Sequence, residues 1–324
     1  MRLKEYYEYD LWYILNWSLI ERCHKIPDFE EYYEKSQKKI NERLTKILEE
    51  SKYEEMEELL NYSIKGGKRF RPTLCLLVSD IFGGNKDDAL TKAAIVEFIH
   101  SSTLVHDDVV DNDKVRREMP SLWNALDKIP YKGPEEFNPK NLAILLGDGM
   151  LSKALILIKK PEVLRAVADS IYSVANGAIK ESKDRIANII GSDSDMEEYL
   201  KTIRLKTGSL FALSTHLGAL TGNASKKQKE LARSAGLKLG IIYQMADDLA
   251  DQDLILSEEE TKELLVQYVN KFMKNISNFP ENKYRKLFEE VPLYIVNKMM
   301  IQDQRPLRLE KNSGNIQWTK NTVK

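Results

Sequence analysis

The stretch AAIVEFIHSSTLVHDDVVD, residues 93–111, is a long apolar run of helical character that ends in acidic residues. A second run of the same kind, LKLGIIYQMADDLAD, occupies residues 237–251. Both runs end in the motif Asp-Asp-x-x-Asp, formed by Asp107, Asp108 and Asp111 in the first and by Asp247, Asp248 and Asp251 in the second. Because residues four apart lie on one face of a helix, each motif places two carboxylates side by side. The sequence therefore predicts two helices, each with a carboxylate pair at its end.

A single acidic cluster in a chain that is 31% charged usually marks a solvated helix face or a helix cap. Two copies, each after residues of the kind that proteins bury, favour a functional site, because buried carboxylates need partners or metals. Sites made only of oxygen ligands suit Mg²⁺, which shares its shell with waters and substrate phosphates. We expect the two pairs to face each other and to hold a diphosphate between metal ions. The expected metal ligands are Asp107, Asp111, Asp247 and Asp251.

Length and composition narrow the class of protein. A chain of 324 residues can form one large domain or two ordinary ones. The formal net charge of −1 gives no reason to expect nucleic acid as a partner, and Cys23 and Cys75 are too few for a disulfide framework or a zinc site. The N-terminus is charged and aromatic, unlike a signal peptide, and no apolar run approaches the ~18 residues of a membrane span. We expect a cytoplasmic protein without a transmembrane segment.

Helical periodicity dominates the chain, and no alternating strand pattern persists beyond a few residues. We predict an all-α bundle over residues 29–300, preceded by an aromatic extension over 1–28 and followed by a polar tail over 301–324. The loop from about Asp127 to Lys140, rich in proline and glycine, is expected to be an excursion from this domain. The aromatic residues of the extension are Tyr6, Tyr7, Tyr9, Trp12, Tyr13 and Trp17. They either pack as an extra helix or contact a membrane surface.

A basic segment precedes the first acidic motif. KGGKRFRP, residues 65–72, has two glycines that free the backbone, followed by Lys68, Arg69 and Arg71. Arginine binds phosphate oxygens through a planar fork, whereas lysine acts as a mobile point charge. The glycine spacing and the Lys-Ser/Thr pair of a Walker motif are absent. The segment therefore indicates an anion site of a different kind.

Further polar residues complete the chemistry. Arg116 and Arg117 follow the first acidic motif closely enough to reach the same anion. Lys206 and Thr207 offer an ammonium and a hydroxyl, and Gln244 stands one turn before Asp248. Together the motifs describe two anionic groups, one held by metals. The other is expected to be held by Lys68, Arg71 and Arg117.

These motifs resemble the trans-isoprenyl diphosphate synthase family, also called polyprenyl synthetases. GGKRFRP, DDVVD, the arginine pair, KTG and YQMADDLAD match the family's motifs in the family's order, from about Phe29 to Asp251. The resemblance implies an isoprenoid-synthase-type helical bundle around a deep central cavity, a homodimer and three Mg²⁺ ions. The family condenses an allylic diphosphate with isopentenyl diphosphate. Ionisation of the allylic diphosphate is followed by attack of the isopentenyl double bond and by loss of a proton to the departing diphosphate.

The resemblance also implies roles for the matching residues. The metal ligands it implies are Asp107, Asp111 and Asp247. The residues implied to bind isopentenyl diphosphate are Lys68, Arg71, His100 and Arg117. Those implied to bind the allylic diphosphate are Arg116, Lys206, Thr207 and Gln244. The residues expected to act in catalysis are Asp107, Asp108, Asp111, Lys206, Asp247 and Asp248. His106, just before the first motif, either serves acid–base catalysis or is only a hydrogen-bonding residue on the helix face.

Two positions depart from the family pattern. Glu118 stands where the family usually has a glycine after the arginine pair. The loop after Asp251 lacks the family's glycine and lysine, is acidic at Glu258–Glu260, and has Lys262 as its only nearby cation. This altered loop motivates one alternative, a non-catalytic subunit of a heteromeric prenyl synthase, although both aspartate motifs are intact. A class I terpene cyclase is a second alternative, but it would have no use for the basic segment that binds a second diphosphate.

Product length should depend on the helix that enters the first motif. The chain grows along the side of this helix one and two turns before Asp107, a helix repeating every ~3.6 residues. Related enzymes that stop early carry bulky aromatic residues four or five places before the first aspartate. Here Thr103 and Ser102 are small, and Ile99 lies one turn deeper. We therefore expect products of C20 or longer, with geranylgeranyl diphosphate the first expectation and C25–C35 also open.

Overall fold

The structure is a computed structural model. It describes residues 27–50, 53–128, 138–189, 196–252, 256–302, 308–312 and 315–319. Four sequence-based predictions therefore lie wholly or partly outside the described residues. They are the aromatic extension, most of the loop between Asp127 and Lys140, part of the loop after Asp251, and part of the polar tail over residues 301–324.

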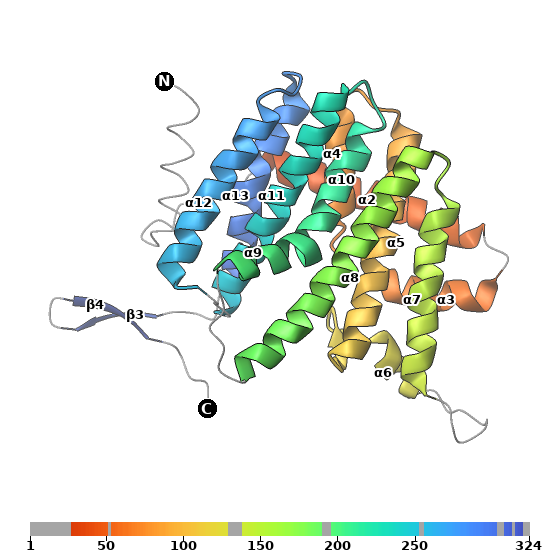
Figure 1. Cartoon of the computed structure of the whole chain (residues 1–324), viewed down its shortest axis with the longest axis horizontal. Coiled ribbons are helices and arrows are strands. Elements are labelled where there is room, and N and C mark those ends of the chain that lie inside the picture. Colours follow the sequence, from red (N-terminus) through yellow and green to blue (C-terminus); the bar gives the residue numbers. More distant parts are fainter. Residues whose placement is uncertain are drawn as a thin grey trace.

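The described chain is a helical bundle, as predicted (Figure 1). Its first helices are α2 (Pro27–Glu49), α3 (Glu54–Ile64), α4 (Phe70–Ile81), α5 (Lys86–Val110), α6 (Leu122–Asp127), α7 (Pro139–Ile156) and α8 (Pro161–Ile189). These are followed by α9 (Met196–Ile203), a π-helix η2 (Arg204–Gly208), α10 (Ser209–Ala219), α11 (Lys226–Asp251), α12 (Glu258–Ile276) and α13 (Lys283–Gln302). Strands β1 (Val115–Arg116) and β2 (Met119–Pro120) form a short antiparallel hairpin after α5. A second antiparallel pair consists of β3 (Arg308–Asn312) and β4 (Asn315–Thr319).

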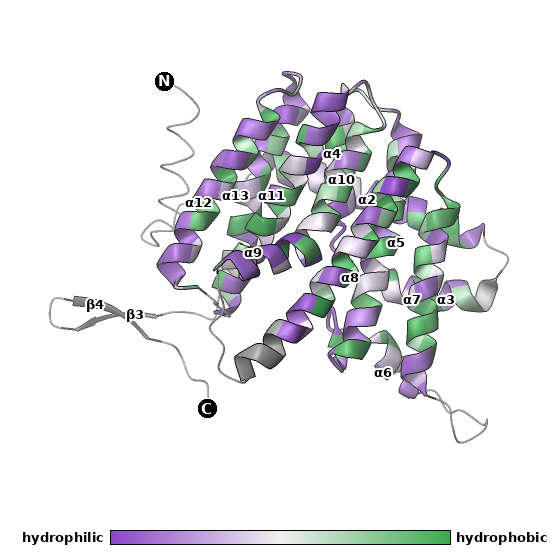
Figure 2. Ribbon diagram, in the orientation of Figure 1, coloured by the Kyte–Doolittle hydropathy of each residue, from purple (hydrophilic) through white to green (hydrophobic). Residues whose placement is uncertain are grey.

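The bundle is organised around α10, which packs against α4, α5 and α11. Glycines on α11 allow this close packing. A Cβ on Gly240 would lie 2.6 Å from the Cα of Gly208 at the end of η2, and a Cβ on Gly236 would overlap the backbone of Phe211 in α10. Helices farther out are amphipathic, and Figure 2 shows hydrophilic and hydrophobic residues alternating along α12. No helix among the described residues has the length and apolar character needed to cross a bilayer.

Both acidic motifs lie at the C-terminal ends of long helices whose starts are well defined. Asn85 caps α5 by accepting a hydrogen bond from the Asp88 backbone N–H, and Ser225 and Gln228 form a capping box at the start of α11. Helix α5 ends at the first motif, and α11 ends at Gln252 in the left-handed conformation. The C-terminal end of a helix carries partial negative charge, so carboxylates there are disfavoured and a bound cation is favoured.

Candidate active site

The two carboxylate pairs stand in an environment that penalises negative charge. Burial raises the pKa of Asp247 to about 6, and the carboxylates of Asp251 and Asp248 add to this increase. Burial also raises the pKa of Asp107; the Lys206 ammonium opposes the increase, and Asp111 adds to it. A bound cation would remove both the burial penalty and the repulsion.

The donor set fits a hard divalent cation. Each helix end offers carboxylate oxygens from two residues one turn apart, Asp107 with Asp111 and Asp247 with Asp251. Within the ranges that the structure describes, no three His, Cys, Asp or Glu side chains converge closely enough to form a complete protein cage for a metal ion. Mg²⁺ is commonly bound by one or two carboxylates and completes its shell with water and substrate phosphates. The arrangement suits Mg²⁺ in that mode.

Asp108 differs from its two neighbours in the motif. Its side chain is only 4% exposed, and Arg116 Nε donates to Asp108 Oδ1 at 2.7 Å. Arg116 Nη2 also donates to Asp113 Oδ2 at 3.0 Å, while Trp123 Nε1 donates to the Asp108 carbonyl at 3.0 Å. Asp108 and Arg116 were assigned to catalysis and to the allylic diphosphate. In this structure they bind each other and attach the β1–β2 hairpin to the end of α5.

The second motif is joined to its predicted neighbours by a chain of hydrogen bonds. Thr207 Oγ1 donates to Gln244 Oε1 at 2.8 Å, and Gln244 Nε2 donates to Asp248 Oδ1 at 2.9 Å. The Tyr199 hydroxyl donates to the other oxygen of Asp248. The chain thus connects α9, η2 and α11. Three predicted site residues, Thr207, Gln244 and Asp248, are brought together as expected.

Lys206 lies on η2 between the two motifs. It forms an ion pair with Glu181 of α8, and its charge acts on Asp107. Gly177, one turn before Glu181, makes this close approach possible, because a Cβ there would lie 2.5 Å from the Lys206 backbone nitrogen. Short π-helical segments are frequent at functional sites, where they reposition a side chain. Here the π-helix presents Lys206 and Thr207 next to the acidic motifs.

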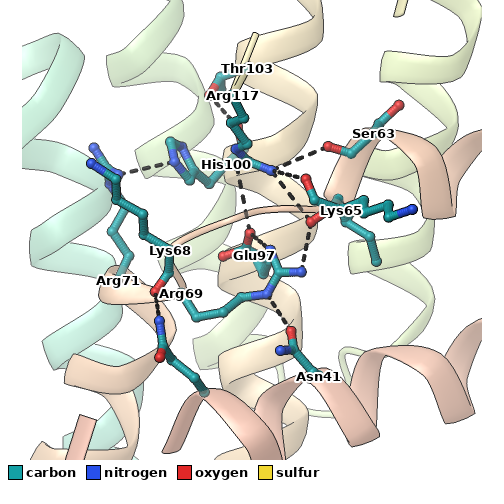
Figure 3. Close-up of polar contacts among 12 residues, drawn as sticks. Asn41, Ser63, Lys65, Lys68, Arg69, Arg71, Glu97, His100, Thr103 and Arg117 are labelled. Atoms are coloured by element: carbon teal, nitrogen blue, oxygen red, sulfur yellow. Dashed lines mark hydrogen bonds and ion pairs between the residues drawn. The ribbon is translucent and has the colours of Figure 1, made fainter. Parts of the chain in front are cut away.

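The residues predicted to bind isopentenyl diphosphate lie close to one another (Figure 3). Arg71 Nη1 lies 3.1 Å from His100 Nε2, and its guanidinium stacks over the rings of Phe211 and Tyr243, with Cζ 4.6 and 5.7 Å from their centroids. Burial lowers the pKa of His100 far below its usual value, and the Arg71 and Arg117 charges lower it further. Since arginine only donates, neutral His100 accepts at Nε2 and carries its proton on Nδ1, which is buried without a partner among the described residues.

Arg117 is presented by the β1–β2 turn. Arg117 and Glu118 both have positive φ, 55° and 62°, as the two central residues of a tight hairpin turn of this type require. This explains why the family usually has glycine at position 118. Arg117 Nη1 reaches back to α3 and donates to the Lys65 carbonyl at 3.2 Å. Glu118 therefore departs from the family pattern by placing a side chain on a left-handed backbone, which glycine adopts without strain.

Other sequence-based assignments have a clear place in the structure. His106 Nε2 lies 3.3 Å from the Ile144 carbonyl and 3.5 Å from Asp148 Oδ1, so it faces α7 and serves as a hydrogen-bonding residue on the helix face. Ile99 and Ser102 are fully buried, and Thr103 is partly buried. Glu258–Glu260 and Lys262, expected in the loop after Asp251, instead form the start of α12, which Ser257 caps, and Lys262 pairs with Glu258 at 2.6 Å.

Sequence reasoning missed several residues that contact the site. They are Arg69, Glu97, Glu181, Tyr199 and Tyr243. One of them had a visible signal, because Glu97 is an isolated carboxylate within the apolar run before the first motif. Buried carboxylates need partners. Arg69 and Tyr243 stand beside Lys68 and Gln244 in segments already identified, but spacing does not show what they contact. Glu181 and Tyr199 come from α8 and α9, whose approach to the site cannot be read from spacing along the chain.

Comparisons with known proteins show the family to which this chain belongs. Residues 53–263 match the family model for polyprenyl synthetase. The chain is 31% identical over 258 residues to the geranylfarnesyl diphosphate synthase of Methanosarcina mazei, covering 79% of this chain and 80% of that protein. It is 27% identical over 291 residues to the hexaprenyl pyrophosphate synthase of Saccharolobus solfataricus, covering 83% and 96%.

Solved structures show the same fold. A polyprenyl synthase from Caulobacter crescentus, complexed with calcium and isoprenyl diphosphate, superimposes with a TM-score of 0.70 at 22% identity, covering 85% of this chain and 98% of that one. A geranyltranstransferase from Methanosarcina mazei gives 0.64 at 27% identity, covering 83% and 98%. An all-α bundle with acidic motifs at two helix ends and a basic segment beside them defines the isoprenoid-synthase class. Within it, this chain belongs to the polyprenyl synthetase family and is a prenyltransferase that makes polyprenyl diphosphates.

Proposed function

We propose that this chain is a Mg²⁺-dependent synthase that condenses an allylic diphosphate with isopentenyl diphosphate to give an all-trans polyprenyl diphosphate. The observation that carries the proposal is the position of Asp247. Burial raises the pKa of Asp247, as do Asp251 and Asp248 of its own motif, while the charges of Lys68 and Arg71 in the basic segment lower it. The second aspartate motif, which we propose binds metal, thus lies next to the basic segment, which we propose binds a diphosphate. Joining two diphosphate substrates requires this proximity, because their reacting carbons must meet.

The residues that would hold Mg²⁺ are Asp107, Asp111, Asp247 and Asp251, and three ions per site are proposed. Bound Mg²⁺ would supply Lewis-acid stabilisation of the negative charge on the leaving diphosphate. The Caulobacter relative was crystallised with calcium, another divalent cation that prefers oxygen ligands.

The protein's own groups would hold both diphosphates. Lys206 would exchange its ion pair with Glu181 for the allylic diphosphate, with Thr207 and Gln244 as further contacts. Lys68, Arg71 and Arg117 would bind isopentenyl diphosphate through charge-assisted hydrogen bonds. The allylic C–O bond breaks, the isopentenyl double bond attacks the resulting cation, and the released diphosphate accepts the proton. The aromatic rings of Phe211 and Tyr243 shield this region from water beside Arg71.

We propose a product of C20 or longer, with geranylgeranyl diphosphate as the first expectation. Ser102 lies buried inside the bundle and is small, whereas bulky aromatic residues at this depth of α5 would stop chain growth early. Ser102→Phe should shorten the product, and Ile99→Ala should lengthen it, because they fill and remove volume at this wall. Thr103→Phe, at a partly exposed position, is the variant to use if Ser102→Phe does not fold. Chromatography of the dephosphorylated products measures the change. A C15 product from the wild type, or unchanged products from both phenylalanine variants, would contradict this wall.

We also propose that the enzyme is a homodimer in the cytoplasm. Support for the dimer comes from large apolar side chains that are exposed on α7 and α8, both of which lie at the front of the bundle in Figure 1. They are Ile144, Leu145, Leu155, Ile156, Leu164, Tyr172 and Ile179. Exposed apolar residues gathered on two helices favour a protein partner, and we take that partner to be a second copy of the chain.

The test is a condensation assay with purified protein, radiolabelled isopentenyl diphosphate and allylic primers of different length, with Mg²⁺ or with EDTA. Chain elongation that EDTA abolishes supports the proposal. A cyclised hydrocarbon would indicate a terpene cyclase. No product from the chain alone, with activity restored by a second subunit, would indicate a regulatory subunit of a heteromeric enzyme. Activity undiminished by EDTA would show that the proposed dependence on Mg²⁺ is wrong.

A further inference from the structure

A buried ion pair lies behind the basic site. Glu97 on α5 is 1% exposed, and its Oε1 accepts a hydrogen bond from Arg69 Nη1 at 2.5 Å. Figure 3 shows the pair between the end of α3 and the start of α4. Removing two charges from water is costly and is tolerated when the geometry is good and other hydrogen bonds complete it. The value of this ion pair to the protein therefore depends on which neighbouring groups it holds in place.

Each of the three guanidinium nitrogens of Arg69 donates a hydrogen bond inside the protein. Its Nε donates to Asn41 Oδ1 at 2.8 Å, and its Nη2 donates to the Ile64 carbonyl at 2.6 Å. With Glu97, these contacts tie α2, α3 and α5 to the residue that precedes α4. Arg69 itself has a left-handed backbone, φ 56°. Since it is 6% exposed and its donors are engaged, Arg69 holds this backbone in place and is not available to a substrate.

The same carboxylate faces Arg117. Glu97 Oε1 lies 4.0 Å from Arg117 Nη2, and its Oε2 has no hydrogen-bond partner among the described residues. Gly67 lies directly against this cluster, because a Cβ there would overlap the Arg69 guanidinium and come within 2.9 Å of Glu97 Oε1. The second glycine of the basic segment is thus required by the ion pair. Glu97 is the carboxylate whose charge also acts on Arg71 and Arg117.

Lys68 is held from the other side. Its carbonyl accepts hydrogen bonds from the Tyr33 hydroxyl and from Gln37 Nε2, the latter at 2.7 Å, both on α2. The residue after it, Arg69, is anchored by the contacts above, so the backbone that carries Lys68 is fixed on both sides.

We propose that Glu97 and Arg69 are positioning residues for isopentenyl diphosphate, and that their ion pair sets the placement of Lys68, Arg71 and Arg117 without contacting the substrate. This inference rests on the proposed function. The Glu97–Arg69 pair should affect the binding of isopentenyl diphosphate and leave the binding of the allylic diphosphate largely unchanged.

A competing explanation makes the opposite prediction. If Glu97 acted only as a negative charge, replacing it by glutamine would raise the positive potential of the site and tighten the binding of a diphosphate. If it positions the arginines, the same replacement weakens binding. The double variant Glu97→Gln/Arg69→Gln separates the two explanations, because it restores the net charge of the wild type while leaving the site without its ion pair.

The experiment compares Glu97→Gln, Arg69→Gln and the double variant with wild type. Glu57→Gln is the matched control: it breaks another largely buried ion pair, Lys153–Glu57 at 2.8 Å between α7 and α3, away from the proposed substrates. The Kd for isopentenyl diphosphate is measured by calorimetry in EDTA, where metal-dependent allylic binding plays no part. The KM for each substrate is then measured with Mg²⁺, and thermal unfolding reports stability.

We expect both single variants and the double variant to raise the Kd and KM for isopentenyl diphosphate by about tenfold or more, the factor for one lost charge-assisted phosphate contact. The allylic KM should change by less than about twofold, well below one such contact, and Glu57→Gln should change neither. Tighter binding in Glu97→Gln with wild-type binding in the double variant would overturn the proposal. So would equal effects on both substrates. A wild type that binds isopentenyl diphosphate without condensing it would refute the proposed function and leave the binding comparison intact.

Discussion

Adjacent carboxylates in the first aspartate motif differ in what surrounds them. Asp107 lies on the face of α5 that points toward Lys206 and Asp111, whereas Asp108 is buried against Arg116. Burial raises the pKa of both, but Asp108 has a hydrogen-bonded guanidinium that favours its charged form. Asp107 is therefore the residue that we propose as a cation ligand, whereas Asp108 holds the hairpin that carries Arg117.

Asp107→Asn and Asp108→Asn should have opposite effects on stability in the absence of metal. Asp107→Asn removes a repulsive charge and should leave the unfolding midpoint unchanged or higher. Asp108→Asn leaves the Arg116 guanidinium poorly paired and should cost roughly 1–3 kcal/mol. Turnover should fall by orders of magnitude in Asp107→Asn because a metal ligand is lost. Denaturant unfolding in EDTA and a condensation assay measure both effects; full activity of Asp107→Asn would refute its role as a ligand.

His100 should make stability depend on pH. Burial and the neighbouring guanidiniums lower its pKa in the folded protein, so the unfolded chain takes up a proton below about 6.5 that the folded protein refuses. This contribution is present above about pH 6.5 and is lost as the pH falls below it. His100→Gln should therefore lose less stability than wild type between pH 7.5 and pH 5. Urea unfolding at several pH values gives the difference. Parallel curves for the two proteins would contradict the assignment.

At the scale of elements, two small irregularities place residues that we propose bind the diphosphates. The π-helix η2 turns Lys206 and Thr207 toward the acidic motifs, and glycines on α8 and α11 make room for it. The β1–β2 turn places Arg117 beside Glu97. This turn requires two non-glycine residues, Arg117 and Glu118, to adopt positive φ, which is sterically strained. Regular helices supply the frame, and these two departures orient the cations.

Glu118→Gly should stabilise the protein by about 1 kcal/mol, because glycine adopts a left-handed backbone without the steric penalty that a side chain incurs. Glu118→Ala is the control, since it removes the same charge but keeps a Cβ and should bring no such gain. Denaturant unfolding of the three proteins measures the difference. Equal gains in both variants would show that charge, and not backbone conformation, limits stability at this turn.

For the whole molecule, the exposed apolar side chains on α7 and α8 set the expected assembly. Leu145 is 64% exposed and Ile156 is 77% exposed, although most large apolar residues of the described chain lie in the two core clusters. The site residues come from the segment before α4, from α4, α5, α8, α9, η2 and α11, and from the β1–β2 hairpin, so the bundle must be complete before the site exists.

Leu145→Asp combined with Ile156→Asp should convert the proposed dimer to a monomer, since two charges would have to be buried in the proposed interface without partners. Tyr53→Asp places the same charge at an exposed aromatic residue, 73% exposed, outside these helices and should leave the assembly unchanged. Light scattering after size-exclusion chromatography gives the mass. A monomeric wild type, or a double variant that stays dimeric, would rule out this surface as the interface.

By itself, the sequence determined the helical class, the two carboxylate pairs and the basic segment. These depend on spacing along one helix or on residue type, which are local properties. The apolar runs also predicted that α5 and α11 would be buried, and this is confirmed.

Only the tertiary structure decided which charges meet across helices. The pairing of Asp108 with Arg116, of Lys206 with Glu181 and of Glu97 with Arg69 each joins residues on different elements. The structure also decided that His106 faces α7 and that Glu118 stands in a strained turn. The physical reason is that such contacts depend on how closely two helices approach and how they are rotated, and packing around glycines such as Gly177 and Gly240 sets both.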